Sequence, residues 1–283
     1  MPGTLHLIAT PIGNLEDITL RALRILRDEV ALIACEDTRQ TEKLLGHYGI
    51  RKPLISYHEH NEASRTAQLV ERLEGGESIA LVSDAGTPLV SDPGYRLVTR
   101  AIERGFPVVP IPGPCAIVTA LAGSGLPTDE FRFIGFLPAK AAARRRVLQE
   151  LRNEQATVIA YETPHRILDC LADVEELLGD RPLVIARELT KIHEEFVRGN
   201  ARTARDQLAR RPSVKGEITL LIGKSETAEA VEDPAAEVEK LQGQGVDRMQ
   251  AIKMVAKRVR VPKRDLYRRC EERGSNPPDR PRR

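Results

Sequence analysis

Residues 78–94, SIALVSDAGTPLVSDPG, join an apolar run to a repeated turn. The run at 78–83 predicts a short buried strand. The pattern Ser-Asp-x-Gly follows directly at 83–86 and occurs again at 91–94. Open α/β sheets bind their ligands outside the carboxyl ends of the strands, where such a loop lies. The stretch therefore predicts an α/β sheet with a ligand-binding loop.

Short apolar runs alternate with longer amphipathic segments on both sides of this stretch. Strands are predicted at 4–9, 30–35, 54–57, 78–83 and 107–111, and helices at 18–27, 41–48, 63–74 and 95–104. Strand and helix in alternation are typical of an open, mostly parallel α/β sheet. The first part of the chain is therefore expected to form one such domain.

The alternation starts again further along the chain and predicts a second α/β domain. Its strands are expected at 131–136, 157–162, 182–188 and 217–222, with helices at 141–152 and 166–178. The expected organisation is an N-terminal α/β domain (1–115), a second α/β domain (116–224), a linker (225–245), a basic helix pair (246–274) and a tail (275–283). A turn at Val261-Pro262 gives the helix pair a helix-turn-helix-like spacing.

The composition favours a cytoplasmic protein. The chain has 283 residues, a net charge of +2 and no apolar run near the roughly 18 residues that a membrane span needs. Its N-terminal segment lacks the basic region and apolar core of a signal peptide. The four cysteines fit neither a zinc site nor a disulfide framework. Aromatic residues make up 4% of the chain, which argues against a stacking platform for single-stranded nucleic acid.

The loops disfavour a nucleotide phosphate as ligand. The sequence contains no Walker A motif, and no G-x-G-x-x-G follows a strand. The loop TPIGNLED at 10–17 and the loop at 83–94 both carry acids. Because phosphates bind exposed amides away from negative charge, a ligand with a cationic group and an adenosine moiety suits these loops better.

Eight segments occur in an order that resembles a known family. They are TPIGNLED (10–17), ACEDTRQT (34–41), SYHEHNE (56–62), LVSDAGTPLVSDPG (81–94), IPGPCA (111–116), FIGFLP (133–138), YETPHR (161–166) and RELTKIHEE (187–195). Together they resemble the tetrapyrrole methylase superfamily, the class III S-adenosylmethionine-dependent methyltransferases. They are most similar to the branch that methylates a cytidine ribose 2′-hydroxyl in 16S rRNA, which also carries a C-terminal helix pair.

The resemblance implies two α/β domains with S-adenosyl-L-methionine bound in the cleft between them, usually in a homodimer. The family's Gly-Asp-Pro loop falls on Ser83-Asp84-Ala85, and its Pro-Gly-x-Thr-Ala loop falls on 112–116 with Cys115 in place of Thr. The cofactor contacts that it implies are Pro11, Ser83, Asp84, Ala85, Gly86, Thr87, Cys115, Ala116, Tyr161, Glu162, Gly216, Glu217 and Ile218.

The second Ser-Asp-x-Gly copy has a simpler interpretation. Ser91 or Asp92 is expected to cap a helix that begins near Pro93, because such side chains satisfy the free N–H groups of a helix start.

A ribose hydroxyl is a poor nucleophile at neutral pH, so a residue that accepts or orients its proton would help. The candidates at predicted strand ends are Glu36, Asp37, His58, His60, Glu162 and His165. Two alternatives stay open: an ion pair of Asp37 with Arg39, and a structural loop pair of His58 with His60. That histidine pair has no third metal ligand at a typical spacing, so no metal site is expected.

Two basic clusters are candidate RNA contacts, with 16S rRNA in the small ribosomal subunit as the predicted partner. From residue 247 onward the chain has 13 Lys and Arg against five Asp and Glu. Such clusters bind phosphates with little sequence preference. The first cluster is Arg144, Arg145 and Arg146, and the second is Lys253, Lys257, Arg258, Arg260, Lys263, Arg264, Arg268 and Arg269. The apolar seam of the same helices is predicted to be Met249, Ile252, Val255, Val259 and Leu266.

The leading hypothesis is an rRNA (cytidine-2′-O-)-methyltransferase. A methylase of tetrapyrrole precursors would share its fold and cofactor, but the basic helix pair and the SDAGTP and YETPHR forms argue against that activity. The third hypothesis is a nucleic-acid-binding regulator whose α/β body senses a metabolite. A regulator has no need for several acidic and histidine-bearing loops around one cleft.

Overall fold

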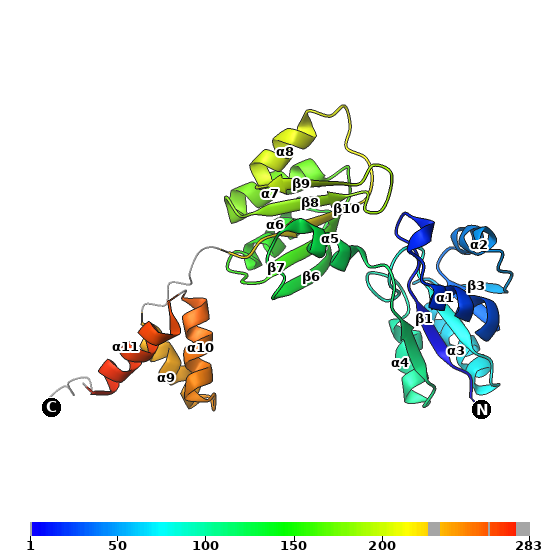
Figure 1. Ribbon diagram of the computed structural model, residues 1–283, viewed down its shortest axis with the longest axis horizontal. Coiled ribbons are helices and arrows are strands. Elements are labelled where there is room, and N and C mark those ends of the chain that lie inside the picture. Colours follow the sequence, from blue (N-terminus) through cyan, green and yellow to red (C-terminus); the bar gives the residue numbers. More distant parts are fainter. Residues whose placement is uncertain (1, 226–232, 260, 276–283) are drawn as a thin grey trace.

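The computed structural model describes residues 2–225, 233–259 and 261–275. Its first domain is built on a five-stranded parallel sheet of order β3-β2-β4-β1-β5 (Figure 1). The strands end close to where the sequence predicts them. They are β1 (Leu5–Ile8), β2 (Leu32–Cys35), β3 (Leu54–Ser56), β4 (Ile79–Val82) and β5 (Val108–Ile111).

Helices cover both faces of this sheet, which explains why its strands are continuous apolar runs. On β4, Ala80 and Val82 join one buried cluster, and Ile79 and Leu81 join the cluster on the opposite face. The helical elements are a 3-10 turn (Leu15–Asp17), α1 (Leu20–Arg24) continued by a π-helix (Ile25–Glu29), α2 (Thr38–His47), α3 (Glu62–Glu74) and α4 (Tyr95–Glu103).

The second domain has a mixed sheet of order β6-β7-β10-β8-β9, in which β6 and β7 are parallel and the other neighbours are antiparallel. Its predicted elements are all present, and three further elements, α5, β9 and α8, were not expected from the sequence. The elements are α5 (Ala116–Ser124), β6 (Phe131–Phe136), α6 (Ala141–Glu150), β7 (Thr157–Glu162), α7 (Ile167–Leu178), β8 (Leu183–Arg187), β9 (Glu195–Gly199), α8 (Ala201–Ala209) and β10 (Ile218–Ile222). The fold is therefore two α/β domains followed by helices.

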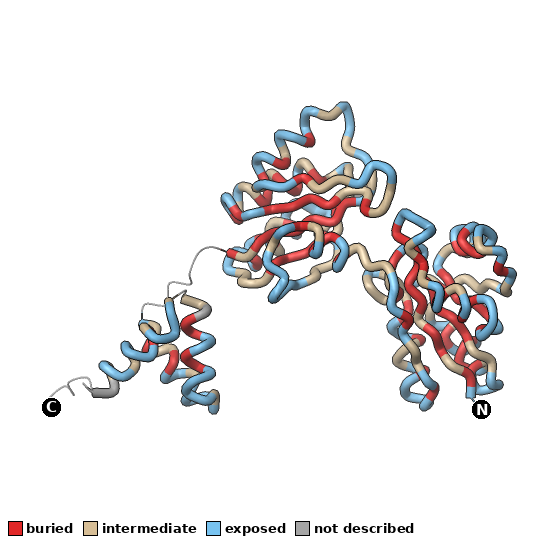
Figure 2. The backbone as a smooth tube through the Cα atoms, viewed as in Figure 1, coloured by how far each residue is buried: buried red, intermediate tan, exposed pale blue. Residues whose placement is uncertain are grey.

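The described residues of the C-terminal region form three helices rather than the expected pair. The segment expected as linker, 225–245, contains α9 (Pro234–Gly243), which packs with α10 (Arg248–Arg258) and α11 (Lys263–Ser275). Val238, Ile252 and Leu266 belong to their buried core. Figure 2 shows buried segments in red on these helices. Met249 is 58% exposed, so its place in the predicted apolar seam is wrong. In the described ranges, no helix is long and apolar enough to cross a membrane.

Candidate functional site

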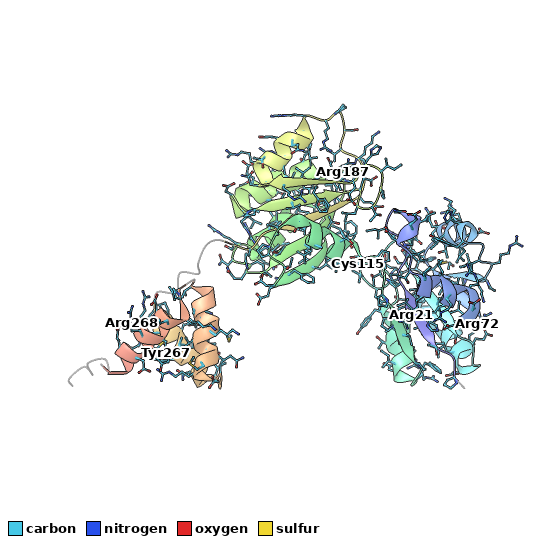
Figure 3. The ribbon with its side chains drawn as sticks, viewed as in Figure 1. Arg21, Arg72, Cys115, Arg187, Tyr267 and Arg268 are labelled. Atoms are coloured by element: carbon cyan, nitrogen blue, oxygen red, sulfur yellow. The ribbon has the colours of Figure 1, made fainter. Side chains whose placement is uncertain are left out.

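A cavity of about 350 Å³ lies between the two α/β domains. Its wall includes residues from the loops after β1 and β4 of the first domain and from β6, β7 and β10 of the second. Seven of the predicted cofactor contacts line it, namely Ala85, Ala116, Tyr161, Glu162, Gly216, Glu217 and Ile218. Pro11, Ser83 and Asp84 line a neighbouring cavity of about 300 Å³, and Gly86, Thr87 and Cys115 line neither. Cys115 lies where the chain passes between the domains (Figure 3).

The loops after β1 and β4 are tied to each other. The backbone N–H of Thr10 donates to Gly86 O and that of Gly86 donates to Thr10 O, both at 2.9 Å. The Thr10 hydroxyl also donates to Ser83 O at 2.8 Å. Gly86 has a φ of 91°, in the left-handed region that glycine adopts at little cost. The Thr87 hydroxyl donates to Pro114 O at 3.1 Å, which joins the 112–116 loop to this pair.

The second Ser-Asp-x-Gly copy does not cap a helix by a side chain. Helix α4 begins at Tyr95, and its N-cap is Gly94 without a side-chain hydrogen bond, so the cap prediction for Ser91 or Asp92 is wrong. Leu89 and Ser91 have φ values of 71° and 66°, and this turn returns Asp92 toward the first copy. The Ser83 hydroxyl donates to Asp92 Oδ2, and Asp92 lines the cavity.

The Asp92 carboxyl is half-buried beside other acids. Burial, and to a smaller degree the charge of Asp84, raise its pKa above the ordinary value. Its hydrogen bond from Ser83 acts in the opposite direction without cancelling the shift. The sequence pattern predicted only a capping role for Asp92, and its place on the cavity wall was not expected.

Glu36 and Asp37 follow β2 but do not line the interdomain cavity. Glu36 is exposed, and partial desolvation followed by the charges of Asp84 and Asp92 raises its pKa. Asp37 is the N-cap of α2 and forms an ion pair with Arg39 at 2.7 Å. Hydrogen bonds from Arg39 lower the pKa of Asp37 to about 2. Asp37 therefore forms the ion pair with Arg39 that was the alternative to a role as base.

His58 and His60 lie in the loop between β3 and α3. Their ring centroids are 5.9 Å apart, and His58 Nε2 is 3.0 Å from Asn61 Nδ2. The Asn61 amide also accepts from the backbone N–H of His58 at 2.9 Å. These contacts match the structural loop pair. Among the described residues, no three His, Cys, Asp or Glu side chains are grouped to hold a metal ion.

Glu162 and Tyr161 face opposite sides of β7. Tyr161 packs with the cluster at the cavity, whereas the Glu162 side chain is fully buried and forms an ion pair with Arg166 at 2.7 Å. Glu162 also accepts from the backbone N–H of Thr163 at 2.7 Å, so it fixes the turn after β7. Burial first, and then nearby negative groups including Asp92, raise the pKa of Tyr161 to about 12. His165 is exposed and lies off the cavity wall.

The edge of the cavity near β10 needs a glycine. Gly216 has a φ of 94°, and a Cβ there would lie 2.4 Å from Glu188 Cγ. The Glu188 carboxylate accepts from the backbone N–H of Glu217 and from Lys191 Nζ, both at 2.9 Å. The loop after β8 also contacts the first domain, because the Asn14 N–H donates to the Thr190 hydroxyl at 3.1 Å.

Comparisons with known proteins agree with this architecture. The sequence matches the family described as Tetrapyrrole (Corrin/Porphyrin) Methylases over residues 4–205. The chain belongs to this family. It is 51% identical over 272 residues to "Ribosomal RNA small subunit methyltransferase I" of Halalkalibacterium halodurans, covering 94% of this chain and 93% of the relative. The protein of the same name from Pasteurella multocida is 49% identical, with 94% and 96% covered.

Solved structures of the family share the fold of this methylase. The uroporphyrin-III-C-methyltransferase of Thermus thermophilus superposes with a TM-score of 0.54 at 21% identity, covering 79% of this chain and 95% of the other. At that identity the likeness concerns the fold alone.

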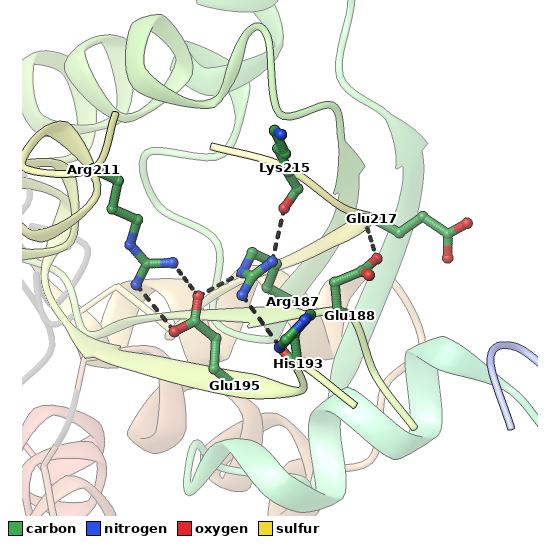
Figure 4. A network of polar contacts seen from close by, with 7 residues as sticks. All are labelled: Arg187, Glu188, His193, Glu195, Arg211, Lys215 and Glu217. Atoms are coloured by element: carbon green, nitrogen blue, oxygen red, sulfur yellow. Dashed lines mark hydrogen bonds and ion pairs between the residues drawn. The ribbon is translucent and has the colours of Figure 1, made fainter. Parts of the chain in front are cut away.

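An ion-pair network holds the loop after β8 in this methylase (Figure 4). Glu195 pairs with Arg187 at 2.5 Å and with Arg211. Arg187 also donates to Lys215 O at 2.9 Å and to His193 O at 3.2 Å. The network thereby links the loop 188–194 to the segment that enters the cavity at Gly216. Hydrogen bonds from Arg211, and then Arg187, lower the pKa of Glu195 to about 2.

We expect Glu195→Gln to lower the free energy of unfolding by about 1–2 kcal/mol at pH 7. Because the Glu195 pKa is depressed in the folded protein, its contribution is present above about pH 4.5 and is lost as the pH falls toward about 2. Thermal unfolding at pH 7 and pH 3.5 checks this: the two proteins should differ less at pH 3.5. An equal difference at both pH values would contradict the assigned charge network.

The first basic cluster is largely committed to internal ion pairs. Arg144 is 5% exposed and pairs with Asp173 at 2.7 Å, and Arg145 pairs with Asp173 at 2.8 Å and with Glu176. The burial of Arg144 argues against its predicted RNA contact. The Arg145 side chain is 32% exposed, and its RNA contact stays a prediction. Arg146 remains 83% exposed, 3.6 Å from Glu150.

The second cluster keeps several exposed cations. Arg258 pairs with Glu237 at 2.9 Å on the neighbouring helix, and its RNA contact stays a prediction. Arg268 lies 3.8 Å from Asp265 and stays 71% exposed (Figure 3). Lys253, Lys263, Arg264 and Arg269 are exposed as well. The side chain of Lys257 and residue Arg260 lie outside the described part of the structure.

Proposed function

We propose that this protein methylates the 2′-oxygen of a cytidine ribose in 16S rRNA of the small ribosomal subunit, with S-adenosyl-L-methionine as the methyl donor. One observation carries the proposal. The relatives named "Ribosomal RNA small subunit methyltransferase I" align over 94% of the chain, which includes helices beyond the matched family segment 4–205. Those helices carry the exposed lysines and arginines of the second basic cluster. A methylase of tetrapyrrole precursors would not need such a basic surface.

The cavity suits this cofactor. Among the described residues, no lysine or arginine lines it, whereas the Asp92 carboxylate does. Glu162 and Glu217 also line the cavity, but they form ion pairs with Arg166 and Lys191. The Asp92 carboxylate therefore favours a sulfonium cation over a phosphate. Ala85, Ala116, Ala186 and Gly216 keep the wall open for an adenosine moiety. When bound there, the cofactor supplies an electrophilic methyl group.

Asp92 is our candidate for the group that accepts the proton of the ribose hydroxyl. The Ser83 hydroxyl donates to Asp92 Oδ2, which fixes the carboxylate on the cavity wall. A carboxylate with a raised pKa is a stronger base than an ordinary one. Asp37 is a weak base by the same criterion, because its pKa is lowered to about 2.

The three-helix module is proposed to hold the rRNA backbone. Its exposed Lys263 and Arg264 lie at the start of α11 and have no counterpart in the family segment. A substrate in the ribosomal subunit implies a cytoplasmic protein, and the family resemblance implies a homodimer. We retain 1–115 and 116–224 as the two α/β domains and propose that the module begins at α9.

Charge reversal tests this module without deleting a packed helix. Lys263→Glu with Arg264→Glu should reduce the slope of log affinity for small subunits against log salt by about 2. Cofactor affinity should not change. Arg21→Glu with Arg51→Glu, two exposed positions of the first domain, is the matched control with the same change in charge. If both double variants have the same salt slope, the module is not the RNA contact.

The experiment that tests the activity combines labelled S-adenosylmethionine with purified protein and small subunits from cells that lack this enzyme. Label should appear on one alkali-resistant, ribose-methylated cytidine of 16S rRNA. Transfer to a tetrapyrrole precursor, with no transfer to the subunit, would replace the proposed substrate.

A further inference from the structure

Strand β6 contains a bulge beside the cavity. Phe133 is opposite Ile159 of β7 and Phe136 is opposite Tyr161, with a shift of register between them. Gly135, within the bulge, has a φ of 69°. In a regular strand two residues three positions apart face opposite sides. Here both phenylalanine rings contact Tyr161, with centroids 5.0 and 5.3 Å from it, so the bulge has turned Phe136 to the cavity side.

The two phenylalanines have different environments. Phe133 packs against the buried cluster under the cavity. Phe136 lines the cavity and is 57% exposed, so one part of the ring packs on Tyr161 and another is open to solvent. A single exposed apolar side chain is ordinary on a protein surface. The exposure of Phe136 is significant because a bulge directs this ring to the cavity wall.

The loop after β4 of the first domain lies opposite this bulge. A Cβ at Gly135 would lie 4.0 Å from the Ser91 hydroxyl, so the bulge lies directly opposite the turn that carries Asp92. A ribose whose hydroxyl meets Asp92 therefore brings its own base to the rim that Phe136 occupies. Because the cavity lies between two domains, we infer that a nucleotide whose ribose enters it is turned away from its stacked neighbours. An unstacked base in a protein site is commonly held on an aromatic face.

We propose that Phe136 stacks on the base of the target nucleotide and so selects a nucleotide that has been turned out of the rRNA. This inference rests on the proposed function. The cofactor's adenine is assigned to the more enclosed wall, beside Ala186, Leu189 and Ile218, which are buried. The low aromatic content still argues against an extended platform, and one ring is sufficient for one base.

The test compares four full-length proteins in methylation of small subunits from cells that lack the enzyme. Phe136→Ala should lower kcat/KM for the subunit by about 10- to 100-fold, the usual effect of losing one stacked base. Phe136→Tyr should retain most of the activity because it keeps the ring. Phe131→Ala is the matched control, since Phe131 is 48% exposed on the same strand but off the cavity wall. It should behave as wild type.

Calorimetry with S-adenosylhomocysteine separates the outcomes. We expect Phe136→Ala to bind it within about twofold of wild type and to unfold at a similar temperature. An equally large loss of S-adenosylhomocysteine affinity would assign the ring to adenine and overturn the proposal. Unchanged kcat/KM in Phe136→Ala would overturn it while leaving the wild-type activity in place. If the wild type transfers no methyl group to the subunit, the proposed function fails and the inference fails with it.

Discussion

Ala85→Trp should abolish measurable binding of S-adenosylhomocysteine, a loss of at least about 100-fold. Ala85 is exposed on the wall of the interdomain cavity, and an indole at this position would project into the space proposed for the cofactor. The loop cannot easily withdraw, because the Thr10–Gly86 hydrogen bonds hold one side and the Ser83–Asp92 contact holds the other. Because these contacts fix the loop, a backbone shift would not relieve the overlap between the indole and the cofactor.

Isothermal calorimetry on the full chain measures this effect directly. Ala142→Trp provides the control, because Ala142 is exposed on α6 and away from the cavity. Ala85→Ser should bind nearly as wild type, because it adds one atom. Undiminished affinity in Ala85→Trp would remove the 83–87 loop from the cofactor site, even if the methyl transfer itself were confirmed.

The first domain could be predicted closely because its chemistry is local. The central strands β2 and β4 are buried on both faces, so each appears in the sequence as a continuous apolar run, LIAC and IALV. The second domain was harder to predict. Only Val197 of β9 is fully buried, and its neighbours are polar or half-exposed, so the strand has no strong pattern. Helix α8 did carry a signal, since Ala201, Ala204 and Leu208 are buried at helical spacing.

The position of the 83–87 loop could be predicted from the sequence, whereas the turn at 89–92 could not. The position of the 83–87 loop follows from the strand before it. The turn at Leu89 and Ser91 places two non-glycine residues at positive φ, which a sequence pattern gives no reason to expect. Arg144 illustrates a different limit. Three consecutive arginines suggest an exposed surface, but the first lies against Asp173 of α7, and only the packing of the two helices reveals that partner.

Asp92→Asn should lower kcat for methylation of small subunits by about 10²- to 10⁴-fold, the usual contribution of a general base. Asparagine has nearly the same shape and can still accept from the Ser83 hydroxyl, so the loop should keep its conformation. The affinity for S-adenosylhomocysteine should change only a few-fold. A comparable loss in affinity would instead make Asp92 a cofactor contact.

The pH dependence of kcat gives a second measure of the same carboxyl. The base acts when ionised, so kcat of the wild type should fall as the pH drops through the raised pKa of Asp92. Asp84→Asn removes a neighbouring negative charge that helps to raise this pKa, so the acidic limb should move to lower pH, whatever happens to the maximal rate. The charge of Asp37 does not contribute to the raised pKa of Asp92, so Asp37→Asn should leave the acidic limb of the kcat profile at the same pH. A limb that is independent of Asp84, or that persists in Asp92→Asn, would assign the proton transfer to another group.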